Sequence, residues 1–269
     1  MRAETAGDLS AGLLAAIAGE LPPGPRDDEV HAWAVPVDLP PAPPEVLRSV
    51  LSADERERAD RFRFEDDRRR YVIGRGVLRV LLGRCTGIEP HLLAFGYGQH
   101  GKPALAEPDG PFPLEFNVSH SGRWVLIGIT RGRVLGVDLE RIRPVADLEA
   151  IAVRHFTTTE AARILSLDGE RRTLAFFACW TRKEACVKAD GAGLSKSLDR
   201  FEVPVLPEDT VGRVRAGGAP GRAPTHWTLW SLLPEAGYLA AVVAGPPDGV
   251  LVPRKWSSRG IEDWSPSSP

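Results

Sequence analysis

The sequence predicts a mixed α+β fold rather than a doubly wound parallel sheet. The predicted strands cluster in the middle and near the end of the chain instead of alternating with helices. No repeat of 20 to 50 residues is visible, which argues against a solenoid or a propeller. With 269 residues, of which 43% are hydrophobic and 26% charged, the chain can bury a full core.

The first half contains one predicted strand, two helices and a pair of further strands. Residues 30–37 form an alternating stretch that lies between two proline-rich segments, as a strand would. Ser52 and Glu55 stand at N-cap and N3, the spacing of a capping box, and so predict a helix start. A second helix is expected over 68–84. Strands are expected over 114–118 and 124–130, separated by a Ser-Gly turn.

The second half begins with a predicted strand over 134–140, after an Arg-Gly turn. A long helical pattern over 170–189 follows, and Gly191 and Gly193 are expected to end it. Further strands are expected over 225–232 and 238–243. The stretch 212–224 and the residues after 246 are rich in Gly, Pro and Ser, which predicts loose segments.

Composition excludes several classes of protein. A net charge of −2 gives no electrostatic basis for binding nucleic acid, which requires a surplus of Lys and Arg. The three cysteines form no C-x-x-C pair and no even disulfide framework. The N-terminal residues lack the layout of a signal peptide, and no apolar run approaches the ~20 residues of a membrane helix. We therefore expect a soluble cytoplasmic protein that does not bind membranes.

Two carboxylates lie on the strand predicted over 134–140. Side chains alternate along a strand, so Asp138 and Glu140 point to one side and Leu135, Val137 and Leu139 to the other. Two like charges this close are unfavourable unless a cation lies between them, and Mg²⁺ prefers oxygen ligands. A solvated strand edge is the better interpretation of these two residues taken alone.

The helix predicted over 170–189 adds a third carboxylate. At 100° per residue Glu184 lies on an apolar stripe with Trp180 and Val187, and a buried carboxylate needs a partner. Lys188, four residues later, could be that partner through an ordinary helix ion pair. Alternatively Glu184 is a third ligand of the cation, and Lys183 and Lys188 face the anion that the metal also binds.

Further candidates come from the first half of the chain. The polar end of Phe116-Asn-Val-Ser-His-Ser-Gly122 offers compact donors suited to phosphate oxygens. The chain has no G-x-S-x-G motif, which argues against a serine hydrolase. On the 68–84 helix, Arg70 projects with the apolar residues, whereas Arg68, Arg75 and Arg79 form a separate basic stripe. Arg70 either turns inward to meet an anion or swings out to solvent. Lys102, at a proline-fixed turn, is another candidate phosphate contact.

Three strings occur in a characteristic order and spacing. They are Phe116-Asn-Val-Ser-His-Ser, Gly136-Val-Asp-Leu-Glu-Arg-Ile-Arg-Pro144 and Trp180-Thr-Arg-Lys-Glu-Ala-Cys-Val-Lys-Ala-Asp-Gly-Ala-Gly-Leu194. Together they resemble the Sfp-type 4'-phosphopantetheinyl transferases, over roughly residues 30–205. His-Gly-Lys-Pro at 100–103 fits the same pattern. Cys186 departs from it, since many relatives have an aromatic residue there, and it is expected to be buried.

The resemblance implies a fold, a reaction and a set of site residues. The fold would be a pseudo-twofold monomer of two similar α/β halves, here 1–133 and 134–250, followed by a loose tail over 251–269. The reaction would move the phosphopantetheine arm of coenzyme A onto a serine of an apo acyl or peptidyl carrier protein and release 3',5'-ADP. Asp138, Glu140 and Glu184 would bind Mg²⁺, Lys183 and Lys188 the pyrophosphate, and Lys102, Asn117, Ser119 and His120 the nucleotide part of coenzyme A.

Some roles rest on more than the resemblance, and two other functions compete with it. Helix geometry together with the family analogy assigns Arg58 and Arg70 to coenzyme A. Glu184 is the candidate general base, with Asp138 and Lys188 as the other catalytic residues. A metal-dependent phosphohydrolase would use the same carboxylates with water as acceptor, and a non-catalytic coenzyme A or carrier-binding module would form no product. Neither the client carrier nor its pathway can be deduced from the sequence.

Overall fold

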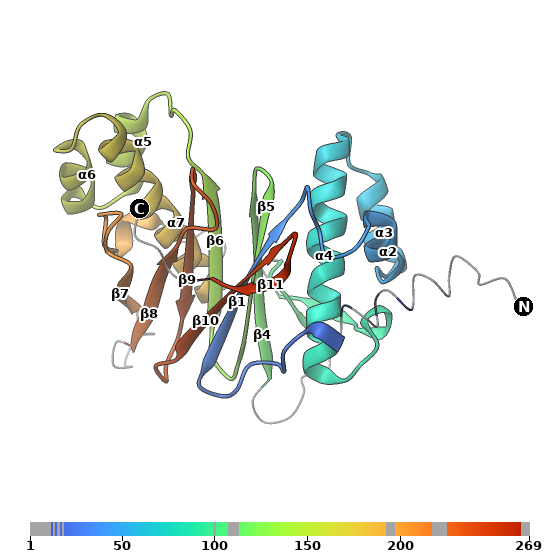
Figure 1. The fold of residues 1–269 in the computed structure, drawn as a ribbon. Coiled ribbons are helices and arrows are strands. Elements are labelled where there is room, and N and C mark those ends of the chain that lie inside the picture. The colour runs from blue at the N-terminus through green and yellow to red at the C-terminus, as the bar shows by residue number, and fades with distance from the viewer. Residues whose placement is uncertain are drawn as a thin grey trace, which may run out of the picture.

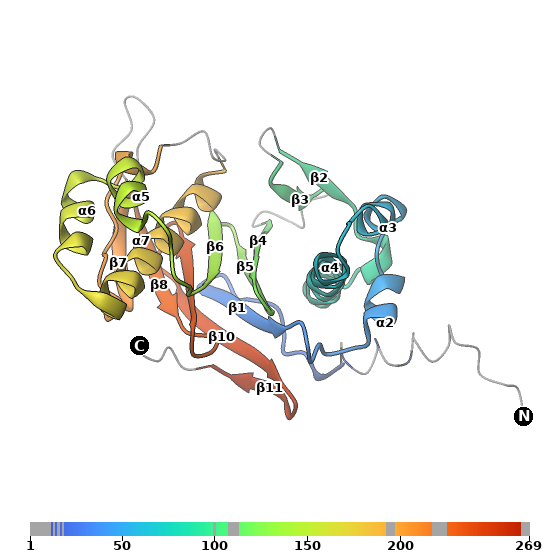
Figure 2. The ribbon, with the colours of Figure 1, turned by 90° about the horizontal axis from the view of Figure 1, so that it is seen from above.

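Two sheets face each other between two long helices, as the computed structural model shows from the side and from above (Figures 1 and 2). The structure describes residues 12, 14, 17, 19–98, 101–106, 113–191, 197–216 and 225–264. In order, the layers are α4, the first sheet, the second sheet and α7. A buried apolar cluster under each helix and a third cluster between the sheets form the core.

The first half contains one face of this arrangement. Its sheet has the order β11-β10-β1-β5-β4, in which β10 (Val250–Ser257) and β11 (Gly260–Asp263) come from the C-terminal end of the chain. Helix α4 packs against β4 and β5. Its elements are β1 (Glu29–Pro36), α2 (Pro44–Ser49), α3 (Ala53–Asp60), α4 (Glu65–Thr86), β2 (Phe95–Tyr97), β3 (Pro103–Leu105), β4 (Leu114–Ser121) and β5 (Trp124–Arg131). β2 and β3 form a separate hairpin.

The second half forms the other face. Its antiparallel sheet has the order β6-β9-β8-β7, and α7 packs against β6 and β9. Its elements are β6 (Leu135–Arg141), α5 (Leu148–His155), α6 (Thr158–Leu165), α7 (Gly169–Asp190), β7 (Val211–Ala216), β8 (Thr225–Leu232) and β9 (Tyr238–Ala244). β6 is an edge strand, so one side of its backbone has no strand partner within the described sheet.

The two halves repeat one topology. Each begins with a strand, continues through two short helices into a 22-residue helix, and ends with two adjacent antiparallel strands. The first strand pairs with the last in both, so that the order β1-β5-β4 corresponds to β6-β9-β8. The mixed α+β fold of two similar halves is therefore confirmed, although the sequence itself displays no internal repeat.

Local sequence signals agree with most of these elements. The Glu55 carboxylate accepts a hydrogen bond from the backbone N–H of Ser52 at 3.0 Å, as the capping-box spacing predicts for the start of α3. Gly191 ends α7 in the left-handed conformation, at φ 71°. Gly193 lies outside the described residues. No helix of the described chain is long and apolar enough to cross a membrane.

The expected loose tail is wrong for the residues that the structure describes after 250. β10 (Val250–Ser257) pairs in parallel with β1, and β11 (Gly260–Asp263) extends the same sheet. Trp256 lies 4.8 Å from Trp33 between ring centroids, and the Trp264 indole N–H donates to the Leu233 carbonyl at 2.9 Å. Buried tryptophans of this size stabilise the C-terminal hairpin against both halves.

Candidate active site

A glycine on β6 allows α7 to approach the strand closely. An ideal Cβ built on Gly136 would lie 2.0 Å from the carbonyl oxygen of Ala185 and 2.4 Å from the backbone nitrogen of Ala189. Only a residue without a side chain permits this contact. The close approach brings the α7 residues Glu184 and Lys188 to the face of β6 that carries Asp138 and Glu140, as the alternation along β6 predicts.

Asp138 is at the centre of this face and is 4% exposed. Its Oδ1 accepts hydrogen bonds from Lys188 Nζ at 2.6 Å and from Ser119 Oγ at 2.9 Å. Its Oδ2 is buried and has no hydrogen-bond partner within the described structure. Because an unpartnered buried carboxylate oxygen is costly, this atom indicates a missing cation or donor.

Glu140 and Glu184 share the electrostatic environment of Asp138. Loss of hydration raises the pKa of Glu140, and the negative charge of Asp138 raises it further. The same two causes, in the same order, raise the pKa of Glu184, whereas Lys188 lowers it. Asp138 therefore repels both Glu140 and Glu184, as expected for anions that lie close together.

The donor chemistry of this cluster fits a hard divalent cation. Three carboxylates supply oxygen ligands alone, and a cation would satisfy the orphaned Asp138 Oδ2 and offset the mutual repulsion. As the side chains stand, no group of three or more His, Cys, Asp or Glu residues in the described ranges is arranged to hold a metal ion. Binding would therefore require the carboxylates to close around the ion.

Positive charge lies directly beside the acidic cluster. Loss of hydration lowers the pKa of the His120 imidazole, and the charges of Arg70 and Lys188 lower it further. Arg70, from the first half, and Lys188, from the second half, thus both lower the pKa of the same imidazole. Arg70 donates to the carbonyl of Gly122 at 2.9 Å and pairs with Asp67, so it reaches the β4–β5 turn rather than solvent.

The structure contradicts the expected position of Lys183. Its side chain is fully buried, and its ammonium contacts the carboxylate of Glu160 on α6 at 2.7 Å. It also donates to the carbonyls of Leu198 and Phe201. Lys183 points away from the acidic cluster because successive residues on a helix differ by 100° in direction, and Glu160 satisfies its charge.

The basic stripe expected on α4 is also not a free surface. Arg79 is 1% exposed, and Arg75 and Arg79 both pair with the buried Glu55, at 2.5 and 2.6 Å. The capping-box signal identified Glu55 but not this second role. These arginines therefore stabilise the first half rather than bind an anion.

Four of the residues expected to contact coenzyme A make contacts within the protein. Asn117 and Ser119 are buried and accept hydrogen bonds from the backbone N–H groups of β6. Lys102 donates to the carbonyl of Leu135 at 2.9 Å, and burial lowers its pKa. Arg58 lies over the Tyr71 ring at 5.3 Å. Their roles toward coenzyme A stay predictions.

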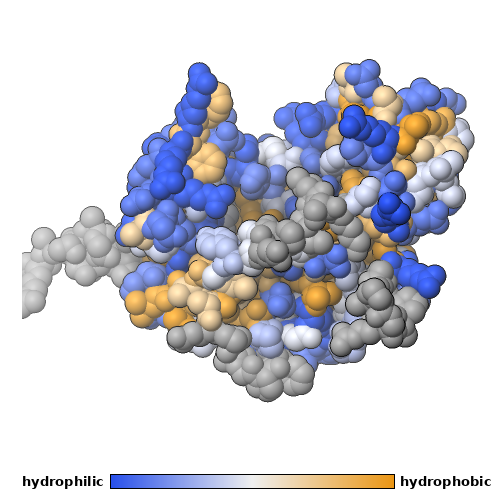
Figure 3. Space-filling view, turned by 180° about the vertical axis from the view of Figure 1, so that it is seen from behind, coloured by the Kyte–Doolittle hydropathy of each residue, from blue (hydrophilic) through white to orange (hydrophobic). Residues whose placement is uncertain are grey.

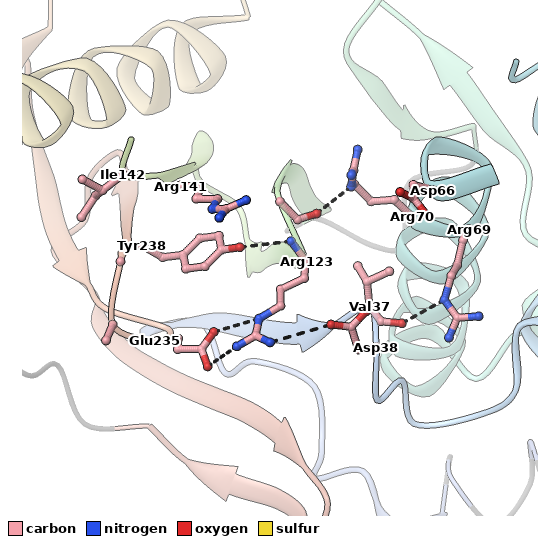
Figure 4. Close-up of a pocket in the computed structure, with 13 residues that line it drawn as sticks. Val37, Asp38, Asp66, Arg69, Arg70, Arg123, Arg141, Ile142, Glu235 and Tyr238 are labelled. Atoms are coloured by element: carbon pink, nitrogen blue, oxygen red, sulfur yellow. Dashed lines mark hydrogen bonds and ion pairs between the residues drawn. The ribbon is translucent and has the colours of Figure 1, made fainter. Parts of the chain in front are cut away.

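A cleft of about 620 Å³ lies between the halves beside the end of β6. Figure 4 shows Arg70 entering it from α4, Arg141 from β6, and Arg123 from the β4–β5 turn, where Glu235 and Asp38 pair with Arg123. Seen from behind, the surface is hollowed between the two lobes, with mostly hydrophilic rims (Figure 3). The sequence reasoning missed Arg123, although its place after a Ser-Gly turn between two strands was the available signal.

Comparison with known proteins gives the family. Residues 134–243 match the model described as "4'-phosphopantetheinyl transferase superfamily", and residues 41–130 match "4'-phosphopantetheinyl transferase, N-terminal". The chain is 40% identical over 219 residues to "4'-phosphopantetheinyl transferase HetI" of Nostoc sp., covering 81% of this chain and 89% of the relative. This chain belongs to the 4'-phosphopantetheinyl transferases.

Other relatives place the transferase in the Sfp type. This chain is 34% identical over 204 residues to "4'-phosphopantetheinyl transferase Sfp" of Bacillus subtilis, and the match covers 76% of this chain and 86% of the relative. A "Phosphopantetheinyl transferase" of Thraustochytrium sp. is 32% identical over 205 residues, with 71% and 70% covered. Neither family match includes β10 or β11. Residues 131–133 separate the two matches and lie at the expected boundary between the halves.

Proposed function

We propose that this transferase moves the 4'-phosphopantetheine group of coenzyme A onto a serine of an apo acyl or peptidyl carrier protein and releases 3',5'-ADP in a Mg²⁺-dependent reaction. One observation carries the proposal: the buried, unpartnered Asp138 Oδ2 lies among carboxylates of raised pKa and beside the ammonium of Lys188. A diphosphate with its metal ion carries the charges that such a site would complement. The names of the relatives support the transferred group.

Asp138, Glu140 and Glu184 would hold the metal ion. When bound, the ion would neutralise the charge that develops on the diphosphate oxygens. Lys188, which already lies 2.6 Å from Asp138, would bind the same diphosphate. Arg70 and His120, on the opposite wall, would orient the phosphate-bearing nucleotide. Lys102, Asn117 and Ser119 stay candidate contacts to the nucleotide part, and Arg58 stays a candidate contact to coenzyme A. We no longer assign Lys183 to the pyrophosphate, because its ammonium pairs with Glu160.

Glu184 is the proposed general base. The serine oxygen of the carrier forms a new bond to the β-phosphorus, the bond from that phosphorus to 3',5'-ADP breaks with its electron pair, and the serine proton passes to Glu184. We expect Glu184→Gln to lower turnover by about 10²- to 10⁴-fold. A Glu184→Gln variant that binds coenzyme A and turns over at the full rate would exclude this role.

Intact-mass spectrometry tests the reaction directly. The full chain is incubated with coenzyme A, Mg²⁺ and a panel of apo-carrier proteins, and each carrier is weighed. The proposal predicts the gain of one phosphopantetheine group on at least one carrier, with stoichiometric 3',5'-ADP. Release of 3',5'-ADP without a carrier would indicate a phosphohydrolase instead, and binding with no product would indicate a binding module.

The proposal includes a monomeric enzyme that acts in the cytoplasm. Its three cysteines form no disulfide with one another, and a reducing compartment keeps thiols in that state. Light scattering on the protein as it elutes from a size-exclusion column should give the mass of a monomer. The mass of a dimer at micromolar concentration would refute that part of the proposal.

A further inference from the structure

Side chains of β4 bind the free edge of β6. Asn117 Oδ1 accepts from the N–H of Val137 at 2.8 Å, and Ser121 Oγ accepts from the N–H of Arg141 at 3.0 Å. Between them, Ser119 Oγ accepts from the N–H of the residue that follows Asp138. Alternate residues of the first half therefore satisfy alternate backbone donors of the second half, where β6 has no strand partner on that side.

The two hydroxyls of this series each make a second, matching contact. Ser119 Oγ donates to Asp138 Oδ1 at 2.9 Å, and Ser121 Oγ donates to Glu140 Oε2 at 3.1 Å. A hydroxyl has a single proton, so accepting from a backbone N–H leaves that proton for the carboxylate. Each serine thus fixes one carboxylate of the acidic cluster relative to the backbone of β6.

Ser121 is the more informative of the two residues. Ser119 also receives a hydrogen bond from Lys188 and is a candidate nucleotide contact, whereas Ser121 has neither role. Burial and the charge of Asp138 both disfavour the ionised Glu140, and repulsion from Asp138 would turn its carboxylate away. Within the described structure, the Ser121 hydroxyl donates the hydrogen bond that the Glu140 carboxylate accepts.

We propose that Ser121 is a positioning residue that holds Glu140 in place for the metal ion, so that the first half of the chain organises a ligand carried by the second. This inference rests on the proposed role of Glu140 as a ligand. Residues that hydrogen-bond metal ligands in this way typically contribute about 10- to 100-fold to metal affinity. Ser121 itself does not contact the ion.

A direct titration of Mn²⁺ into the full chain, with saturating 3',5'-ADP, tests the proposal. Free Mn²⁺ is followed by electron paramagnetic resonance, so the readout does not depend on turnover. We expect Ser121→Ala to weaken Mn²⁺ binding about 10- to 100-fold and Ser121→Thr, which keeps the hydroxyl, to restore it to within about threefold. In turnover assays the Mg²⁺ concentration for half-maximal rate should rise, with the KM for coenzyme A unchanged at saturating metal.

Ser257 provides a matched control. Its hydroxyl also donates to a glutamate, Glu262 at 2.7 Å, and accepts from a backbone N–H, that of Arg259 at 3.0 Å, but it lies in the β10–β11 hairpin. Ser257→Ala should leave Mn²⁺ affinity unchanged. If Ser121→Ala does not fold, as judged by circular dichroism, Ser121→Cys removes most of the donor strength at similar volume and is titrated instead.

The outcomes separate this inference from the function on which it rests. Wild-type Mn²⁺ affinity in Ser121→Ala or Ser121→Cys, together with a loss in Glu140→Gln, overturns the role of Ser121 and leaves the metal site standing. Wild-type affinity in Glu140→Gln overturns the ligand assignment and the role of Ser121 with it. An equal loss of affinity in Ser257→Ala would show a global effect of the substitutions and would also overturn the inference.

Discussion

Gly136→Ala is the most direct test of how α7 assembles the candidate site. The added Cβ would lie 2.0 Å from the Ala185 carbonyl oxygen, whereas ordinary contact begins at 3.4 Å. The helix backbone must therefore retreat by about 1.4 Å, because no flexible side chain can move aside. Overpacking of this kind costs about 1 to 3 kcal/mol, and contact with backbone on both sides favours the upper end.

The same displacement should affect activity more than stability. Glu184 and Lys188 lie on the part of α7 that Gly136 contacts, so they would move away from Asp138 with the helix. A misplacement of about 1 Å in a site can lower turnover about 100-fold. We expect Gly136→Ala to lose about 2 to 3 kcal/mol in urea unfolding and about 100-fold in carrier modification.

Gly96 on β2 supplies the control. A Cβ at Gly96 meets nothing within 4 Å, and its backbone does not require glycine. Gly96→Ala should therefore change the free energy of unfolding by no more than about 0.5 kcal/mol. If Gly136→Ala matched Gly96→Ala in both stability and turnover, the close approach of α7 to β6 could not be what positions Glu184 and Lys188.

Two further predictions concern buried ionisable groups. Lys183→Met should lower the free energy of unfolding by about 3 to 5 kcal/mol, because it leaves the Glu160 carboxylate buried without its cation. Lys188→Met, whose side chain is 29% exposed, should cost less, and a stable Lys183→Met that lost only turnover would restore Lys183 to the pyrophosphate. Burial raises the pKa of the Cys85 thiol from 9.0 to about 11, so the folded state keeps its proton where the unfolded chain loses it. The resulting stability is fully present below pH 9 and is lost as the pH rises toward 11, so melting temperatures across this interval should fall more steeply for the wild type than for Cys85→Ala; parallel curves would contradict this.

Periodicity and capping signals were sufficient for part of the local structure. The alternation along β6 placed Asp138 and Glu140 on one face correctly, and Cys186 is buried at 3% exposure, as expected. These signals depend only on neighbours in sequence, since a strand or helix repeats its direction every few residues. They did not identify every local element, since α5, α6 and β7 were not predicted.

The errors involve partners that are distant in sequence. The strand from Val250 pairs with β1, more than 200 residues earlier, and its composition alone resembled a loose tail. Lys183 lies next to Glu184 in sequence, but its direction on α7 leads to Glu160 on α6. The helix pattern predicts both lysines as anion contacts, and nothing in it indicates that Lys183 pairs with Glu160, outside the acidic cluster, whereas Lys188 pairs with Asp138 within it.

The repeated topology brings unlike groups together between the two halves. The two halves repeat one topology, yet they contribute unlike groups: β6 and α7 supply the three carboxylates and Lys188, whereas β4 and α4 supply the hydroxyls, His120 and Arg70. An acidic cluster with an unpartnered oxygen is unfavourable by itself, and donors from the opposite half offset part of that cost. Under the proposed function, a metal-bound diphosphate would supply the charges that complement this unpartnered oxygen and its neighbouring carboxylates.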